Sequence, residues 1–337
     1  MKRLGSLLIM GVMALSLLYF QTGCGGGSGA STSREGGPDA SLTVSNAEQV
    51  GDTVTQAVKL VAPAAALGDL KTSSVSPEKR PPLLSILEKV LPVSGKSIQA
   101  KHMSGASVFN EDCAGGGSIT VNITGVDILK ELINADINVS SCTVGAQTLN
   151  GTMHVEYIVG SIDALTNPTL DNLKNFKKVT ITTSDFTYVN TTNTDNVTLN
   201  DLTLVLQDFT YNGNVLTGGS ITLGGVTTGT IDGEVVDIEC DSFGLLFNTD
   251  PAGTAVSVSG RIKASCLGGW VTMVTNQSVF VPANAHCPTG GDIVVSAGGN
   301  AVTVHIAADF KITISFNGNV VKTFNSCSEV KGLCVKP

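Results

Sequence analysis

The chain has 337 residues, a formal net charge of −8 and only 14% charged residues, below the ~25% usual for soluble domains. No basic patch of the kind that neutralises phosphates occurs, which argues against nucleic acid as a partner. Thr, Ser, Asn and Gly carry the polarity instead. This composition favours an extracellular or cell-envelope β protein.

The first 23 residues predict export. Lys2 and Arg3 form a basic start, the run from 4 to 20 is almost entirely apolar, and small residues lead to Cys24. Charge, apolar run and small residues in this order are typical of a secretory signal peptide. Two alternatives stay open. One is a plain cleaved signal with Cys24 as an ordinary thiol, and the other is a retained membrane helix, for which about 20 apolar residues are needed.

Thr22, Gly23 and Cys24 resemble the lipobox of bacterial lipoproteins, although Gln21 replaces the usual aliphatic residue. The resemblance implies that Cys24 is lipidated after cleavage and anchors the protein to a membrane. Gly25 follows where an Asp is the inner-membrane retention signal in some bacteria, so the outer membrane is favoured. We expect residues 24–44, which are rich in Gly and Ser at their start, to form a flexible tether.

Residues 45–105 are predicted to contain helices. Ser45 and Glu48 have the spacing of a capping box, and apolar residues recur at three- and four-residue intervals from Ala47 and Val50 onwards. A second short helix is predicted over 82–91, between two prolines. Neither helix has the basic polar face of an interfacial helix, so packing on the main domain is favoured over a membrane-surface role.

From 106 to 337 the apolar period changes to two. The runs 118–124, 202–206, 302–306 and 312–316 alternate apolar and polar residues, which predicts strands covered on one face. Asn317-Gly318 predicts a hairpin turn. The predicted fold class is therefore all-β, an antiparallel β-sandwich or curved β-meander with a short helical N-terminal segment. A change in composition suggests a sub-boundary near 266.

Eight cysteines suit a disulfide framework in an exported protein. Pairs placed symmetrically about predicted turns face each other across a hairpin. Three pairs are predicted: Cys113 with Cys142, Cys266 with Cys287, and Cys327 with Cys334. Cys240 is left over. Zinc is disfavoured because no Cys-x-x-Cys motif occurs.

No catalytic, cofactor-binding or metal-binding residue is predicted. The four histidines are outside any Gly-x-Ser-x-Gly or His-Glu-x-x-His motif, and His305 is expected on a solvated strand face. Trp270 is expected to be a core anchor, with sugar stacking as the alternative. The stretch 179–260 holds ten acids and no Lys or Arg. A calcium site at 190–201 is one interpretation of these acids, but we expect an acidic surface instead.

Three functions are compatible with these features. The favoured one is a lipid-anchored, non-enzymatic cell-envelope protein with a structural or protein-interaction role. The alternative is a carbohydrate- or cation-binding module displayed at the outer membrane. The second alternative is an outer-membrane β-barrel, which 5% aromatic residues make less suitable. The expected partners are the membrane through the lipid at Cys24 and an envelope protein or glycan, at the periplasmic side or the cell surface.

Overall fold

The computed structural model describes residues 37–50, 108–127, 132–159, 176–192, 195–212, 215–231, 234–264, 267–283 and 287–329. The predicted signal peptide with Cys24, the helix predicted over 82–91, and Cys266 and Cys334 lie outside these ranges.

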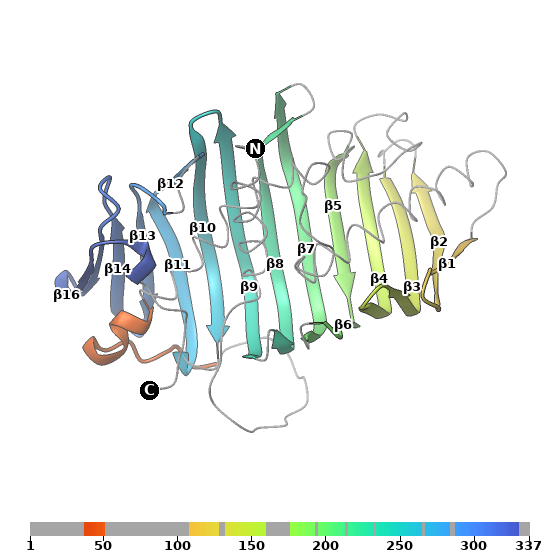
Figure 1. Cartoon of the computed structure of the whole chain (residues 1–337), viewed down its shortest axis with the longest axis horizontal. Coiled ribbons are helices and arrows are strands. Elements are labelled where there is room, and N and C mark those ends of the chain that lie inside the picture. The colour runs from red at the N-terminus through yellow and green to blue at the C-terminus, as the bar shows by residue number, and fades with distance from the viewer. Residues whose placement is uncertain are drawn as a thin grey trace.

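Within these ranges, sixteen strands form one antiparallel sheet, which extends across the molecule in Figure 1. The strands are β1 (Val108–Asp112), β2 (Ser118–Asp127), β3 (Leu132–Val144), β4 (Gln147–Val159), β5 (Phe176–Thr183), β6 (Asp185–Asn190), β7 (Asp195–Asn212), β8 (Val215–Ile231), β9 (Glu234–Asp250), β10 (Gly253–Ala264), β11 (Gly269–Gln277), β12 (Val279–Pro282), β13 (Asp292–Ala297), β14 (Asn300–Ile306), β15 (Ile312–Phe316) and β16 (Asn319–Phe324).

The sheet is a meander, because almost every strand pairs with the next one along the chain. β5 and β6 together fill the place between β4 and β7, and β12 pairs with one end of β10. The predicted all-β antiparallel class is confirmed, and of the two predicted architectures the meander is the one found. β11 pairs with both β10 and β13, so the sheet continues across the composition change near 266.

One face of the sheet is apolar and buried, and the other is polar and exposed. The alternation predicted over 118–124 is present, with Ile119, Val121 and Ile123 buried. The largest fully buried side chains on this face include Tyr157 and Tyr188. Burying one large apolar side chain contributes roughly 1.5–3 kcal/mol, so this face holds the sheet together and leaves the opposite face for function.

β-bulges interrupt the alternation in the long strands. The chain adopts positive φ angles of 47°, 46° and 52° at Ser141, Asp201 and Ser242. Near Asp201 the register between β7 and β8 shifts. The buried side chains therefore change from odd-numbered positions such as Leu199 to even-numbered positions such as Leu202. Gly225 on β8 faces this bulge, and a Cβ there would lie 2.5 Å from the Asp201 carbonyl oxygen. Bulges bend and twist a strand, which lets strands of up to 18 residues curve together.

The N-terminal segment, residues 37–44, docks on the start of β11. The Ala40 amide donates to the Trp270 carbonyl at 2.9 Å, and the Trp270 amide donates to the Pro38 carbonyl at 3.1 Å. Ala40 and Leu42 are buried. The tether predicted over 24–44 was therefore too long at its C-terminal end, since its last residues are part of the folded domain.

A helix follows over residues 44–50. Ala47 and Val50 are buried, which confirms the predicted apolar face in this part of the helix. The predicted capping box at Ser45 was wrong, because the helix begins after Thr43. The Thr43 amide donates to Asn46 Oδ1 at 2.8 Å, so the side chain that caps the helix start bonds two residues earlier than predicted.

One predicted disulfide is confirmed and two predicted pairings were wrong. Cys113 is bonded to Cys142, with their Cα atoms 5.4 Å apart. Cys287 is bonded to Cys327, with their Cα atoms 5.6 Å apart, and not to Cys266. The predicted hairpin about 276–277 does not form, because β12 pairs with β10 and β13 takes the place beside β11.

Candidate functional site

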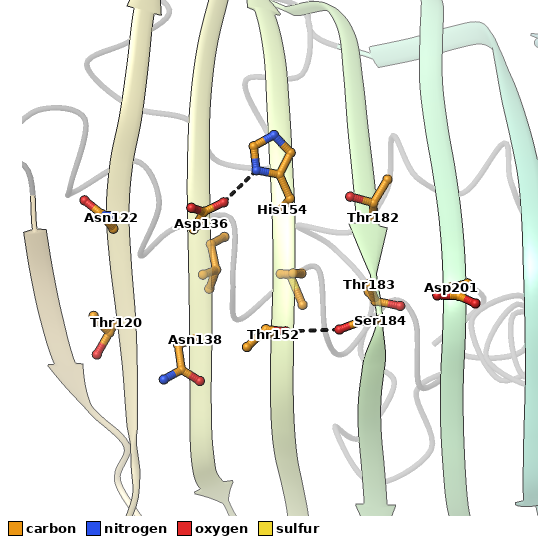
Figure 2. A pocket seen from close by; sticks show the side chains of 12 residues that line it. Thr120, Asn122, Asp136, Asn138, Thr152, His154, Thr182, Thr183, Ser184 and Asp201 are labelled. Carbon is orange, nitrogen blue, oxygen red and sulfur yellow. Dashed lines mark hydrogen bonds and ion pairs between the residues drawn. The ribbon is translucent and has the colours of Figure 1, made fainter.

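A hollow of about 510 Å³ lies on the exposed face of the sheet, over β2, β3, β4, β5 and β7 (Figure 2). Most residues that line it have hydroxyl, amide, carboxylate or imidazole side chains. The lining residues are Thr120, Asn122, Asp136, Ile137, Asn138, Thr152, Met153, His154, Thr182, Thr183, Ser184 and Asp201.

Antiparallel register arranges these side chains in two rows that cross the strands. In the first row, Asn122 faces Asp136, Asp136 faces His154, and His154 faces Thr182. Thr203 on β7 faces Thr182 and ends the row. Each strand thus contributes one polar side chain, at the interstrand spacing of about 4.8 Å.

The second row lies two residues further along the strands. Thr120 faces Asn138, which faces Thr152. The hydroxyl of Thr152 lies 3.3 Å from that of Ser184, the residue between β5 and β6. The Asp201 amide donates to the Ser184 carbonyl at 3.1 Å, so the bulge residue places its exposed carboxyl group at the end of this row.

An Asp–His pair lies in the middle of the first row. Nδ1 of His154 lies 2.6 Å from Oδ1 of Asp136, and since an ionised carboxylate only accepts, Nδ1 donates. Figure 2 shows the second ring nitrogen on the side away from Thr152 and Ser184. The imidazole is thus fixed in place without facing these two hydroxyl groups as a base would face a nucleophile.

A second Asp–His pair lies near the other end of the same exposed face. His305 Nδ1 is 2.6 Å from Asp292 Oδ1, and the two residues face each other across β13 and β14. His305 is exposed, as predicted from its strand, but its pairing was not predicted. Neither residue lines the hollow, so this pair is a natural control for Asp136 and His154. His102 and His286 lie outside the described residues.

The acidic residues of the stretch 179–260 do not all lie at the surface. Asp195 is buried beside Asn190, which it faces across the β6–β7 hairpin. Oδ1 of Asn190 accepts from the Thr192 amide at 3.0 Å, which is an Asx turn. The expectation of a purely surface role was therefore wrong for Asp195. In the described ranges no three His, Cys, Asp or Glu residues gather closely enough to hold a metal ion.

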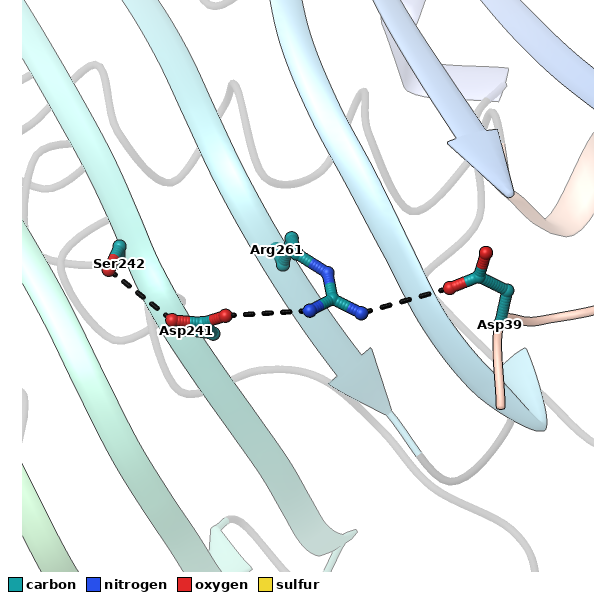
Figure 3. A network of polar contacts seen from close by, with 4 residues as sticks. All are labelled: Asp39, Asp241, Ser242 and Arg261. Carbon is teal, nitrogen blue, oxygen red and sulfur yellow. Dashed lines mark hydrogen bonds and ion pairs between the residues drawn. The ribbon is translucent and has the colours of Figure 1, made fainter. Parts of the chain in front are cut away.

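Trp270 is buried, with only 6% of its surface exposed. The predicted core anchor was wrong, however, because Trp270 lies on the polar face with Lys263, its partner on β10, and not in the apolar core. The Arg261 guanidinium lies 4.9 Å from the centre of its ring. Arg261 in turn bridges Asp241 on β9 and Asp39 in the N-terminal segment, at 3.6 and 3.7 Å (Figure 3). Because the ring is covered, Trp270 does not offer the open face that stacking on a sugar requires.

Cys240 is the free cysteine of the described part of the chain, in agreement with its being left over by the predicted pairs. Burial, with a smaller effect from the charge of Glu239, raises the pKa of its thiol to about 12 from an ordinary 9.0. The thiolate is therefore scarce at neutral pH, and Cys240 is not suited to a nucleophilic role.

We expect Cys240 to react with iodoacetamide at pH 8 at least ~30-fold more slowly in the native protein than in urea. The raised pKa lowers the thiolate fraction roughly a thousandfold, and the greater nucleophilicity of a high-pKa thiolate offsets part of that. Mass spectrometry of the Cys240 peptide measures both rates. Equal rates in the two conditions would show that the thiol is not buried.

Neither Asp136 nor His154 was predicted to be a site residue. Both occupy polar positions of alternating strands, but their contact depends on the register between β3 and β4, which no local pattern specifies. Among the described residues, no helix is long and apolar enough to span a membrane. Neither a protein-family model nor a curated protein matches this chain, so its function is inferred from the geometry of the site.

Proposed function

We propose that this protein is a lipid-anchored, non-enzymatic component of the cell envelope that binds a carbohydrate on the exposed face of β2–β7. The hollow carries the proposal. Ten of its twelve lining residues are Thr, Ser, Asn, Asp or His, whose side chains can hydrogen-bond sugar hydroxyl groups.

The chemistry of the hollow favours an uncharged, polyhydroxylated ligand. Its lining contains no Lys or Arg, so nothing there neutralises a phosphate or a sulfate. One of its two carboxylates, Asp136, is already engaged by His154. The remaining groups are mostly neutral hydroxyls and amides, which recognise hydroxyl groups without requiring charge.

The arrangement also favours binding over catalysis. Glycosidases use two carboxyl groups that flank one bond, whereas here Asp136 is held by His154 and Asp201 lies in the other row, three strand positions away. An acyl-transfer site needs a nucleophile facing the histidine, and Thr152 and Ser184 lie on the other side of the His154 ring from its second nitrogen (Figure 2).

The envelope location in the proposal rests mainly on the sequence. The signal peptide and the lipobox resemblance support lipidation of Cys24 and an outer-membrane anchor, and the two disulfides suit an oxidising compartment. A binding face on an exported, anchored protein meets the glycans of the cell envelope or of the cell surface.

The proposal predicts that Asp136→Ala and His154→Ala weaken glycan binding at least about tenfold. Each change removes the protein partner of a hydrogen bond to the glycan, and losing a hydrogen bond that involves a charged group costs ~1.5–3 kcal/mol. A glycan array of the protein without its signal and tether would identify ligands, and titration calorimetry would give each Kd. Asp292→Ala and His305→Ala are the matched controls, because they remove an identical cross-strand pair away from the hollow.

The control variants should bind with the affinity of the wild type. Equal losses in both pairs would place the effect in the stability of the sheet and not in the site. A blank array would rule out carbohydrate binding and leave the structural or protein-interaction role, which cross-linking in the envelope would then test.

A further inference from the structure

We propose that the ligand of the hollow is a linear, neutral, β-1,4-linked glycan that lies across the strands, with about one sugar per strand. This inference rests on the carbohydrate binding proposed above and goes beyond it, because it specifies the linkage, the direction and the length of the bound chain.

The spacing of the strands carries the inference. Neighbouring strands are about 4.8 Å apart, which is close to the rise of one sugar along an extended β-1,4-linked chain. The first row offers Asn122, Asp136, His154, Thr182 and Thr203 on five successive strand positions. A chain that crosses the strands therefore meets a new polar side chain at each sugar.

The two rows together match the width of such a chain. Positions two residues apart on a strand are separated by ~6.8 Å, so a sugar ring lying between the rows has polar groups on both of its edges. On β4 these groups are His154 and Thr152, and on β3 they are Asp136 and Asn138. A compact monosaccharide would use only one or two strands and leave the rest of the rows without a ligand.

The twist of the sheet restricts the ligand further. Adjacent strands are rotated by roughly 20–25°, so the rows turn as they cross the sheet. A single soluble chain with rotatable linkages can follow this turn, whereas the flat surface of a crystalline polysaccharide cannot contact the whole row. The α-1,4-linked chains coil, and they do not keep successive sugars in step with successive strands.

Chain length provides the test. With the protein that lacks its signal and tether, Kd is measured for β-1,4-linked glucose and N-acetylglucosamine oligomers of one to about eight sugars. We expect Kd to fall with each added sugar until about five, the number of strand positions in the row, and then to stay constant. The α-1,4-linked glucose oligomers should bind at least about tenfold more weakly at equal length.

Two variants probe the position of the chain. Asn122→Ala removes the polar side chain at the β2 end of the first row, so we expect it to abolish only the gain from the last sugar. Thr182→Val, at the fourth of the five positions, should weaken binding of oligomers of four or more sugars. Thr313→Val is the matched control, since Thr313 occupies the corresponding place beside His305.

The outcomes separate the two proposals. If no sugar of any length binds, carbohydrate binding itself is wrong. If monosaccharides bind as tightly as hexasaccharides, or if α- and β-linked chains bind equally, carbohydrate binding stands and the linear-chain inference is overturned. A preference for crystalline cellulose or chitin over soluble oligomers would also overturn it.

Discussion

Replacing Cys24 with Ser should transfer the full-length protein from the membrane fraction to the soluble fraction. The serine side chain cannot form the thioether to the lipid that the lipobox resemblance implies, and without acyl chains the protein loses ~0.8 kcal/mol of membrane affinity per buried CH₂ group. Metabolic labelling with palmitate and fractionation of the envelope measure the change, and the label should be absent from the variant.

Cys240→Ser is the control for this experiment. It also removes one thiol, but from a free cysteine within the sheet, so both fractionation and labelling should match the wild type. A wild-type protein that is soluble and carries no palmitate would overturn the anchor and leave a plain cleaved signal.

The anchor and the folded domain are close together along the chain. Pairing of residues 38–40 with β11 attaches the N-terminal segment to the sheet, and the chain between Cys24 and Gly37 spans at most about 45 Å when fully extended. If Cys24 is lipidated as proposed, the start of β11 is confined to within about that distance of the lipid. Since the hollow lies over β2–β7, towards the other end of the sheet (Figure 1), such an anchor would leave the proposed binding face away from the anchor point.

Local patterns predicted the strands well. Alternation identified the cores of β2, β14 and β15, and Asn317-Gly318 marked the β15–β16 turn that the structure contains. These features depend on neighbouring residues only, because a half-buried strand needs an apolar side chain at every second position. The Cys113–Cys142 bond was also predictable, since it joins the β1–β2 turn to the nearby strand β3.

Long-range register is what local patterns did not reveal. At Asp201 an extra residue shifts the alternation of buried and exposed side chains. The polar residues around it contain no local pattern that predicts a bulge. Asp136 and His154 are 18 residues apart, and only the pairing of β3 with β4 makes them neighbours. Cys287 was assigned to the wrong partner because β12 joins β10 and not β11. The hollow is therefore a property of the assembled sheet.

Removing either observed disulfide should destabilise the protein by about 3.5–4 kcal/mol in the loop-entropy treatment of the unfolded chain. The two bonds close loops of similar length, with separations of 29 residues for Cys113–Cys142 and 40 for Cys287–Cys327. At about 2–4 °C for each kcal/mol in a large domain, we expect Tm to fall by roughly 7–15 °C.

The variants for this test replace both cysteines of a pair by Ala, so that no free thiol or buried hydroxyl remains. Cys240→Ala is the control, since it removes a cysteine sulfur without opening a loop, and its Tm should fall by much less. Calorimetry gives Tm, and peptide mapping without reduction gives the pairing in the wild type. A peptide that links Cys287 to Cys266 would contradict the pairing, whereas equal Tm values for the double variants and the control would show that the loops do not stabilise the fold. The expected result is a similar, large decrease for both pairs, because the entropy of loop closure grows only with the logarithm of loop length.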